Sequence, residues 1–161
     1  MKTFSSVRKK GFTLVELLIV IMIIAILSGM MMLSTGSATD GAESIKVIND
    51  LRNLKGAALM FYMDNNSWPT GNPVNAAVAS SLDRYMDRSF IATNPRYAAV
   101  WVTSAEVGGI ERTLIGVTLT GNSAKSGVQQ KLAGNALQSG LYSAPGAAYT
   151  AGGLRIGMNM N

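Results

Sequence analysis

The sequence contains neither cysteine nor histidine. Their absence excludes disulfide bonds, thiol nucleophiles, imidazole general bases and the usual zinc ligands. Charged residues are also few, at 14% of the 161 residues, whereas apolar residues make up 48%. This composition is unusually apolar for a soluble domain, and a membrane-inserted segment would account for it.

The net charge of +5 comes mostly from the first eleven residues, which hold four of the fourteen basic residues and no acidic one. These four are Lys2, Arg8, Lys9 and Lys10. The rest of the chain has ten basic and nine acidic residues, a net charge of +1. Its basic residues are scattered and are not clustered with aromatic residues, so we do not expect a nucleic-acid partner.

A long apolar segment follows this basic stretch. From Leu17 to Leu33, Ser28 is the only strongly polar residue. A helix that starts at Phe12 and ends at Leu33 would be about 33 Å long, close to the ~30 Å of a bilayer's hydrocarbon core. Because basic residues precede the segment, the positive-inside rule places the start of the chain in the cytoplasm and the rest outside.

One acidic residue, Glu16, interrupts the apolar segment. A carboxylate at mid-helix costs about 2.5–3.5 kcal/mol on insertion scales, and less near a helix end. Glu16 could lie at the membrane interface, where the positive end of the helix dipole favours it. Alternatively, it needs a buried cation, and a free amine at Phe12 would lie on the same helix face, four residues earlier.

The twelve residues from Lys9 to Val20, KKGFTLVELLIV, resemble the prepilin signature of type IV pilins and type II secretion pseudopilins. The resemblance combines a basic pair, a glycine before an aromatic residue, an acid at a fixed offset and a long apolar helix. It implies that a membrane aspartyl protease cleaves between Gly11 and Phe12 and then methylates the amine of Phe12. It also implies that Glu16 neutralises the Phe12 amine of an adjacent subunit during assembly.

The same resemblance implies a function and a division of the chain. The protein is expected to be a structural subunit of a pilus-like or pseudopilus filament, not an enzyme, with no cofactor, no metal and no catalytic residues. Its expected partners are other pilin subunits, a prepilin peptidase, an inner-membrane assembly platform and, before assembly, the lipid bilayer. The segments are a leader (1–11), a transmembrane or filament-core helix (12–33), an amphipathic continuation (34–63) and a C-terminal body (64–161).

Two alternatives remain open at this stage. The protein could be a minor pilin at a filament tip, with a body that binds a surface, DNA or a secreted substrate. The leader could also be an ordinary secretory signal, cleaved near Gly36-Ser37-Ala38, although Glu16 would have no role there. The family often has a proline near the end of the apolar segment, whereas the first proline here is Pro69. Ser28-Gly29 is therefore the best local candidate for a weak point in the helix.

An amphipathic helix is predicted after the apolar segment. Apolar residues recur there at steps of three and four, which is typical of one buried helix face. They are Ile45, Ile48, Leu51, Leu54, Ala58 and Phe61/Tyr62. The helix could run without a break from Phe12 to Tyr62, or a hinge near Gly36–Gly41 could separate two helices. Turn-forming residues from Asp64 to Pro73 predict a loop after it.

The body is predicted to be an α+β fold in which the long N-terminal helix packs on a small antiparallel β-sheet. A short helix is expected within residues 74–89. Two strands, Tyr97–Val107 and Ile110–Thr120, flank Gly108-Gly109, a two-residue hairpin signal. A second short helix should bury one apolar side. That side comprises Val128, Leu132 and Ala136/Leu137. Residues 141–161 could hold short strands near Tyr142 and 154–158, forming an edge strand or a loop.

The acidic residues of the body do not suggest a metal or catalytic site. No Asp or Glu follows Glu111. Calcium requires several oxygen ligands, usually carboxylates, so we expect no C-terminal calcium site of the kind found in some pseudopilins. Asp83 and Asp87 lie at close spacing, but no third carboxylate or histidine accompanies them.

Overall fold

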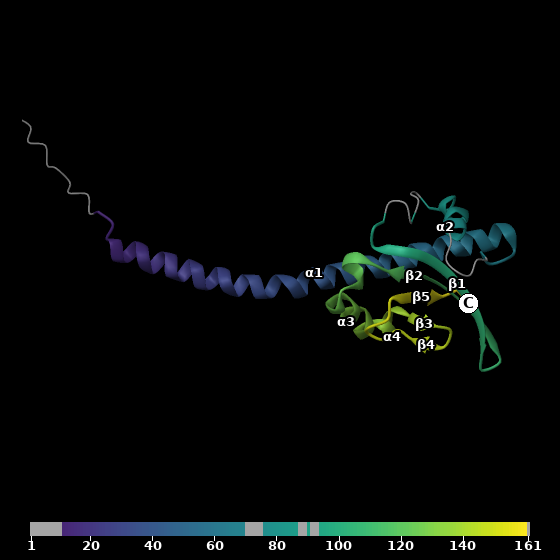
Figure 1. The fold of residues 1–161 in the computed structure, drawn as a ribbon. Helices are drawn as coiled ribbons and strands as arrows, with labels where there is room; N and C mark the ends of the chain where they lie inside the picture. Colours follow the sequence, from purple (N-terminus) through teal and green to yellow (C-terminus); the bar gives the residue numbers. More distant parts are fainter. Residues whose placement is uncertain (1–10, 70–75, 87–89, 91–93, 161) are drawn as a thin grey trace, which may run out of the picture. The chain divides into compact units, whose positions relative to one another are not determined.

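The computed structural model describes residues 11–69, 76–86, 90 and 94–160, without the side chains of 33–35 and 76–79. The chain divides into two compact units, residues 1–36 and 37–161, which are described separately below. Figure 1 shows the elements in chain order. The α+β prediction is confirmed: a long N-terminal helix accompanies a small antiparallel sheet.

The N-terminal helix, α1 (Leu14–Asn65), contributes to both units. Residues 36–41 and Ser28-Gly29 are part of this helix, so a helix break near Gly36–Gly41 is not observed. The helix ends at Asn65, three residues beyond the predicted end at Tyr62, so Asp64 and Asn65 belong to the helix and not to the predicted loop. Asn66 has a φ of 51°, and its N–H donates to the Tyr62 carbonyl at 2.7 Å. A left-handed residue directly after a helix is a common C-terminal cap, and asparagine tolerates this conformation.

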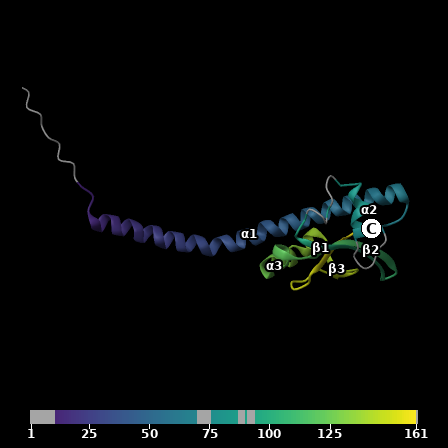
Figure 2. The same ribbon diagram turned by 45° about the horizontal axis from the view of Figure 1, so that its top comes forward.

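The sheet of the second unit has five strands in the order β1-β2-β5-β3-β4, and all pairs are antiparallel. The strands are β1 (Tyr97–Val107), β2 (Ile110–Leu119), β3 (Leu141–Ala144), β4 (Ala147–Ala148) and β5 (Arg155–Asn159). Figure 2 shows β1, β2 and β3 from a second direction. The short strands predicted near Tyr142 and 154–158 are present as β3 and β5, but β5 is not the edge strand, because it lies between β2 and β3 and the edge on that side is β4. Three successive β5 residues (156–158) are buried, as in a strand covered on both faces.

The predicted hairpin is confirmed at Gly108-Gly109, which join β1 to β2. Both glycines have positive φ, 65° and 79°, the pattern of a type I′ turn that only glycine and a few polar residues adopt readily. The β2–β5 pairing runs from Leu114 to Thr118. Residues 105–112, here called the hairpin tip, therefore extend as a two-stranded ribbon past the β2–β5 ladder.

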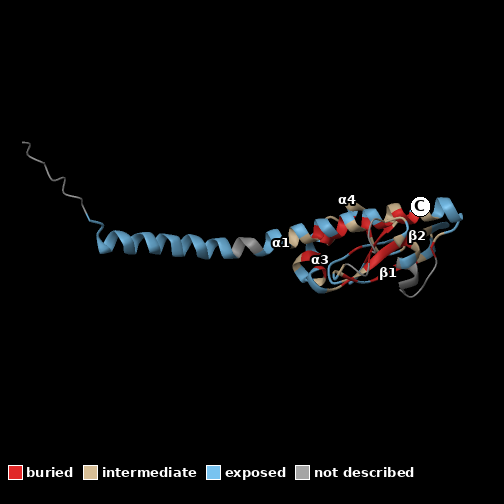
Figure 3. Cartoon of the chain, turned by 90° about the horizontal axis from the view of Figure 1, so that it is seen from above, coloured by how far each residue is buried: buried red, intermediate tan, exposed pale blue. Residues whose placement is uncertain are grey.

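The buried face of α1 in the second unit packs on the sheet, and Figure 3 shows it as a red stripe along the helix. Its buried residues are Val47, Ile48, Leu51, Leu54, Ala57 and Ala58. The predicted stripe was partly wrong, because Ile45 is 58% exposed and Val47 is fully buried in its place. Both Val47 and Ile45 fit steps of three and four from the common residues, so spacing alone could not select the face.

Four short helical segments complete the second unit: α2 (Ala76–Asp83), the 3₁₀ helix η1 (Gly121–Ala124), α3 (Ser126–Gly134) and α4 (Ala136–Ser139). The helix expected within 74–89 is present but ends at Asp83; residues 74–75 and 87–89 lie outside the described residues. Ala136 is buried as expected, whereas Leu137 is 87% exposed. Because α3 ends at Gly134 and α4 begins at Ala136, the helical spacing does not continue across Asn135, and Leu137 faces outward.

Polar contacts join α1 to the start of β1. The Tyr97 hydroxyl donates to Asp50 Oδ2 at 2.7 Å, and the Asn94 side-chain amide donates to the same oxygen at 3.3 Å. Two turns earlier on α1, Glu43 forms an ion pair with the Nε of Arg96 at 2.5 Å. Burial, followed by the Asp50 contact, raises the pKa of Tyr97 well above its ordinary value, so its hydroxyl remains a donor at neutral pH.

The indole of Trp101 covers two glycines on the face of the sheet opposite to the one that packs on α1. Trp101 pairs with Gly116 in the β1–β2 register, and Gly116 pairs with Gly157 in the β2–β5 register. The indole is fully buried and the guanidinium of Arg155 lies 4.5 Å from its ring centre. A Cβ atom at Gly116 would lie 2.4 Å from Trp101 Cζ2 and 2.3 Å from the Ile156 carbonyl oxygen. Only glycine therefore fits beneath the ring.

We expect Gly116→Ala to destabilise the second unit by about 1–3 kcal/mol, because the added methyl overpacks the space under Trp101. The free energy of unfolding of the detergent-solubilised chain, followed by tryptophan fluorescence, measures this. Gly134→Ala is the matched control, since a Cβ at Gly134 would have no atom within 4 Å. Equal effects of the two substitutions would contradict the packing argument.

Candidate functional site

The predicted processing residues lie just before α1. Gly11, Phe12 and Thr13 are not helical, and α1 begins at Leu14. The Phe12 side chain is 77% exposed, and the space around the Cα of Gly11 is open. The Gly11–Phe12 peptide bond therefore lies in irregular backbone two residues before the first helical turn.

Thr13 and Glu16 form a reciprocal set of hydrogen bonds at this helix start. The Glu16 amide donates to Thr13 Oγ1 at 3.2 Å, and the Thr13 amide donates to Glu16 Oε2 at 2.9 Å. The Thr13 hydroxyl donates to the same oxygen at 2.8 Å. The Thr13 carbonyl accepts the first helical bond, from the Leu17 amide at 3.3 Å. This arrangement is a capping box, which satisfies amides that have no partner in a helix's first turn.

The structure thus shows that Glu16 caps its own helix, a role within one chain that was not predicted. Within one chain, the carboxylate of Glu16 accepts hydrogen bonds from the amide and the hydroxyl of Thr13, both through Oε2. The interchain pairing of Glu16 with Phe12 stays a prediction. Thr13 was not predicted as a site residue, although the sequence contains its signal: Thr13-Leu14-Val15-Glu16 matches the threonine-x-x-glutamate pattern of a capping box.

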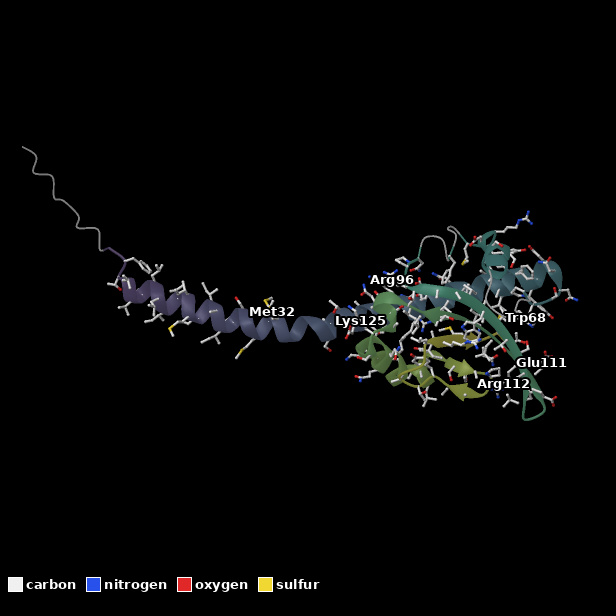
Figure 4. All side chains as sticks on the ribbon, in the orientation of Figure 1. Met32, Trp68, Arg96, Glu111, Arg112 and Lys125 are labelled. Atoms are coloured by element: carbon white, nitrogen blue, oxygen red, sulfur yellow. The ribbon has the colours of Figure 1, made fainter. Side chains whose placement is uncertain are left out.

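Apolar side chains surround α1 in the first unit. Every described residue of this unit, from Gly11 to Met32 and at Gly36, is exposed, and Figure 3 shows it in pale blue. In Figure 4 the side chains project from the helix on both sides, with Met32 labelled. The helix is long and apolar enough to cross a membrane, by length and composition. An apolar stretch of 18 residues in this helix has a mean hydropathy of 2.7, and none of that stretch is buried.

The described part of the body contains no grouping of three or more Asp, Glu, His or Cys residues that could hold a metal ion. The carboxylate of Asp83 accepts a hydrogen bond from the Phe90 amide at 3.0 Å, which is a structural contact. Asp87 lies outside the described residues.

Comparison with known proteins addresses this N-terminal segment directly. Residues 7–32 match the family model of the prokaryotic N-terminal methylation motif. The matched residues contain the stretch, residues 9–20, that resembles the signature of type IV pilins and type II secretion pseudopilins. The signature includes the basic pair, Gly11, Phe12 and Glu16, on which the sequence-based resemblance rested.

Two curated relatives illustrate what the chain is similar to. The chain is 36% identical over 63 residues to type II secretion system core protein G of Klebsiella pneumoniae, covering 39% of this chain and 45% of that protein. It is 28% identical over 117 residues to fimbrial protein EcpC of Eikenella corrodens, covering 71% and 76%. The chain spans about half the length of the core protein G relatives that it matches.

A solved structure of the major type IV pilin PilA1 from Clostridium difficile aligns with 77% of this chain and 98% of its own. The identity is 22% and the TM-score is 0.43. This superposition is too loose to carry a conclusion.

We expect Thr13→Ala to loosen the first turn of α1, because the N-terminal cap loses its side-chain acceptor. Losing such a cap costs about 1 kcal/mol. Amide hydrogen exchange in detergent micelles measures the effect at Val15 and Glu16, whose exchange should speed up. Thr13→Ser keeps the hydroxyl and is the control. Unchanged exchange in the alanine variant would contradict the capping role.

Proposed function

We propose that this protein is a structural subunit of a type IV pilus-like or pseudopilus filament and that its N-terminal helix is the assembly element. The observation that carries the proposal is the exposed apolar helix of the first unit. Thr13 and Glu16 cap the first turn of this helix, and most of it lies within the methylation motif. A helix that is apolar on every face needs lipid or other helices around it. A bundle of such helices from many subunits provides that cover in a filament.

The proposed order of events follows from the position of each residue. The chain enters the inner membrane with its basic leader in the cytoplasm and its body outside. A prepilin peptidase hydrolyses the Gly11–Phe12 bond and methylates the new amine. An assembly platform then moves the subunit from the bilayer into the filament. Nothing in this sequence of steps requires the subunit itself to be an enzyme or to hold a cofactor.

The proposed role of Glu16 is to pair with the Phe12 amine of a neighbouring subunit. Helices in lipid have no bulk hydrophobic drive to associate, so packing and buried polar contacts select partners. The Thr13 contacts use one carboxylate oxygen, Oε2, and leave the other outside the capping box. A single carboxylate can therefore cap its own helix and accept a contact from a neighbour.

Mass spectrometry of the mature protein tests the processing step. We expect a chain that begins at Phe12 and carries one extra methyl group on its α-amine. A chain that begins near Thr39, after the small residues at 36–38, would instead indicate an ordinary secretory signal and would overturn the proposal.

Substitution of Glu16 tests the assembly step. We expect Glu16→Gln to insert into the membrane and to be cleaved normally, yet to be lost from filaments, because it keeps the shape but not the charge that neutralises an amine. Cell fractionation, mass spectrometry and electron microscopy of filaments measure the three steps. Val15→Ala, next in sequence, keeps the carboxylate and should assemble. Normal incorporation of the Glu16→Gln subunit would contradict the pairing role.

A further inference from the structure

Two glycines lie inside α1 close to the boundary between the two units. Gly36 and Gly41 are both helical, and a Cβ atom at either position would meet no side chain and no other element within 4 Å. Packing therefore does not require them, and glycine inside a helix is less stable than alanine. The Ser44 hydroxyl donates to the Gly41 carbonyl at 2.7 Å, a local bond that competes with regular helical pairing. The helix is thus weak at Gly41 by its own sequence.

Asp40, directly before Gly41, contacts the start of α3. It is half-buried, whereas residues 36–39 are exposed. A Cβ atom at Gly127, the second residue of α3, would collide with Asp40 Oδ2 and would lie 2.9 Å from its Cγ. Lys125 makes no side-chain hydrogen bond as the cap of α3, and the first turn of α3 has no acidic residue. The Asp40 carboxylate therefore supplies the negative charge that the positive end of a helix favours.

Glu43, three residues further along α1, holds the same part of the body through its ion pair with Arg96. The Arg96 carbonyl accepts hydrogen bonds from the Thr120 amide at 2.8 Å and from the Ser123 hydroxyl at 2.7 Å. These two residues lie in and directly before η1, which leads into α3, and Figure 4 labels Arg96 and Lys125 at this place. The contacts of Asp40 with Gly127 and of Glu43 with Arg96 are here called the latch.

The apolar core does not reach this turn of α1. Among the residues of α1 whose burial the structure describes, Val47 is the first buried apolar one. The latch lies before Val47 and on both sides of Gly41. The latch, and not the apolar core, is therefore placed to hold the turn at Gly41.

We infer that the latch holds α1 closed at Gly41, so that the turn opens more often when the latch is released. Hinges are formed by a few residues that absorb a change in backbone angles, and the turn at Gly41 is such a hinge under the control of α3 and Arg96. The inference goes beyond the proposed filament function and does not depend on it, because both contacts lie within one unit of one chain.

Amide hydrogen exchange of the full chain in detergent micelles tests the latch. The reporting amides are those of residues 41–45, because their helical acceptors are the carbonyls of residues 37–41. Asp40→Asn removes the charge at the start of α3, and Gly127→Ala displaces the carboxylate with a methyl group. Each should speed exchange of these amides by roughly two- to fivefold, the ratio for losing one contact between a charge and a helix end. The double variant should exchange no faster than the faster single variant, because both substitutions remove one contact.

Gly134→Ala is the matched control for Gly127→Ala, because both place alanine in α3 and the space around Gly134 is open. By helix propensity alone, both substitutions favour α3, so only the collision with Asp40 distinguishes them. Gly134→Ala should leave the exchange of residues 41–45 unchanged. Glu106→Gln removes an exposed carboxylate elsewhere in the same unit and should also leave it unchanged.

The sheet amides of Val117 and Ile156 separate a hinge from a general loss of stability. They should keep their exchange rates in Asp40→Asn and Gly127→Ala. Equal acceleration of residues 41–45 and of the sheet would show that Asp40 stabilises the whole unit, which overturns the inference. Unchanged exchange of residues 41–45 in both variants would overturn it as well. Because the experiment needs no filament, neither result bears on the proposed function.

Discussion

The structure depends first on the need to cover the apolar helix of the first unit, which is exposed at every residue whose burial the structure describes. The side chains of residues 12–32 are exposed around the whole helix. Each apolar Å² left in water costs about 25 cal/mol, so this segment is stable only in lipid or among other helices. The environment that this helix needs follows from this constraint more directly than from any feature of the body.

The body satisfies its own constraints internally. Its core joins one face of α1 to one face of the sheet, and buried residues fill the interface from both sides. The contacts of Asp50 with Tyr97 and of Glu43 with Arg96 fix where β1 starts along α1. Hydrogen bonds to a charged group contribute about 1.5–3 kcal/mol each, more than neutral ones. Unlike the apolar contacts of the core, these contacts require particular atoms to meet, so they select one position of β1 along α1.

The sequence predicted the elements whose signals are local. The apolar helix, the helix end near Asp64 and the Gly108-Gly109 hairpin each depend on residues that are neighbours in the chain. The methylation motif was equally local: residues 7–32 match it, and Gly11, Phe12 and Glu16 lie within that range, although their processing and pairing roles stay predictions. The capping role of Thr13 was equally local and could have been found.

What the sequence could not predict depends on partners far away in the chain. The place of β5 is decided by its pairing with β2 and β3, which its own residues do not reveal. Ile45 and Val47 both fit a helical stripe, and only the position of the sheet selects Val47. Leu137 turned outward because the helix restarted at Ala136. The two glycines under Trp101 are likewise explained by a ring from another strand.

The central position of β5 has a consequence for the order in which the body can form. The strand that completes the sheet, Arg155–Asn159, follows β2 by more than thirty residues. Until it emerges during synthesis, the β1–β2 hairpin has no second neighbour at the sheet's centre, and isolated hairpins are only marginally stable. The N-terminal helix precedes it and forms from local contacts alone. The long helix can therefore form early, while the sheet still lacks its middle strand.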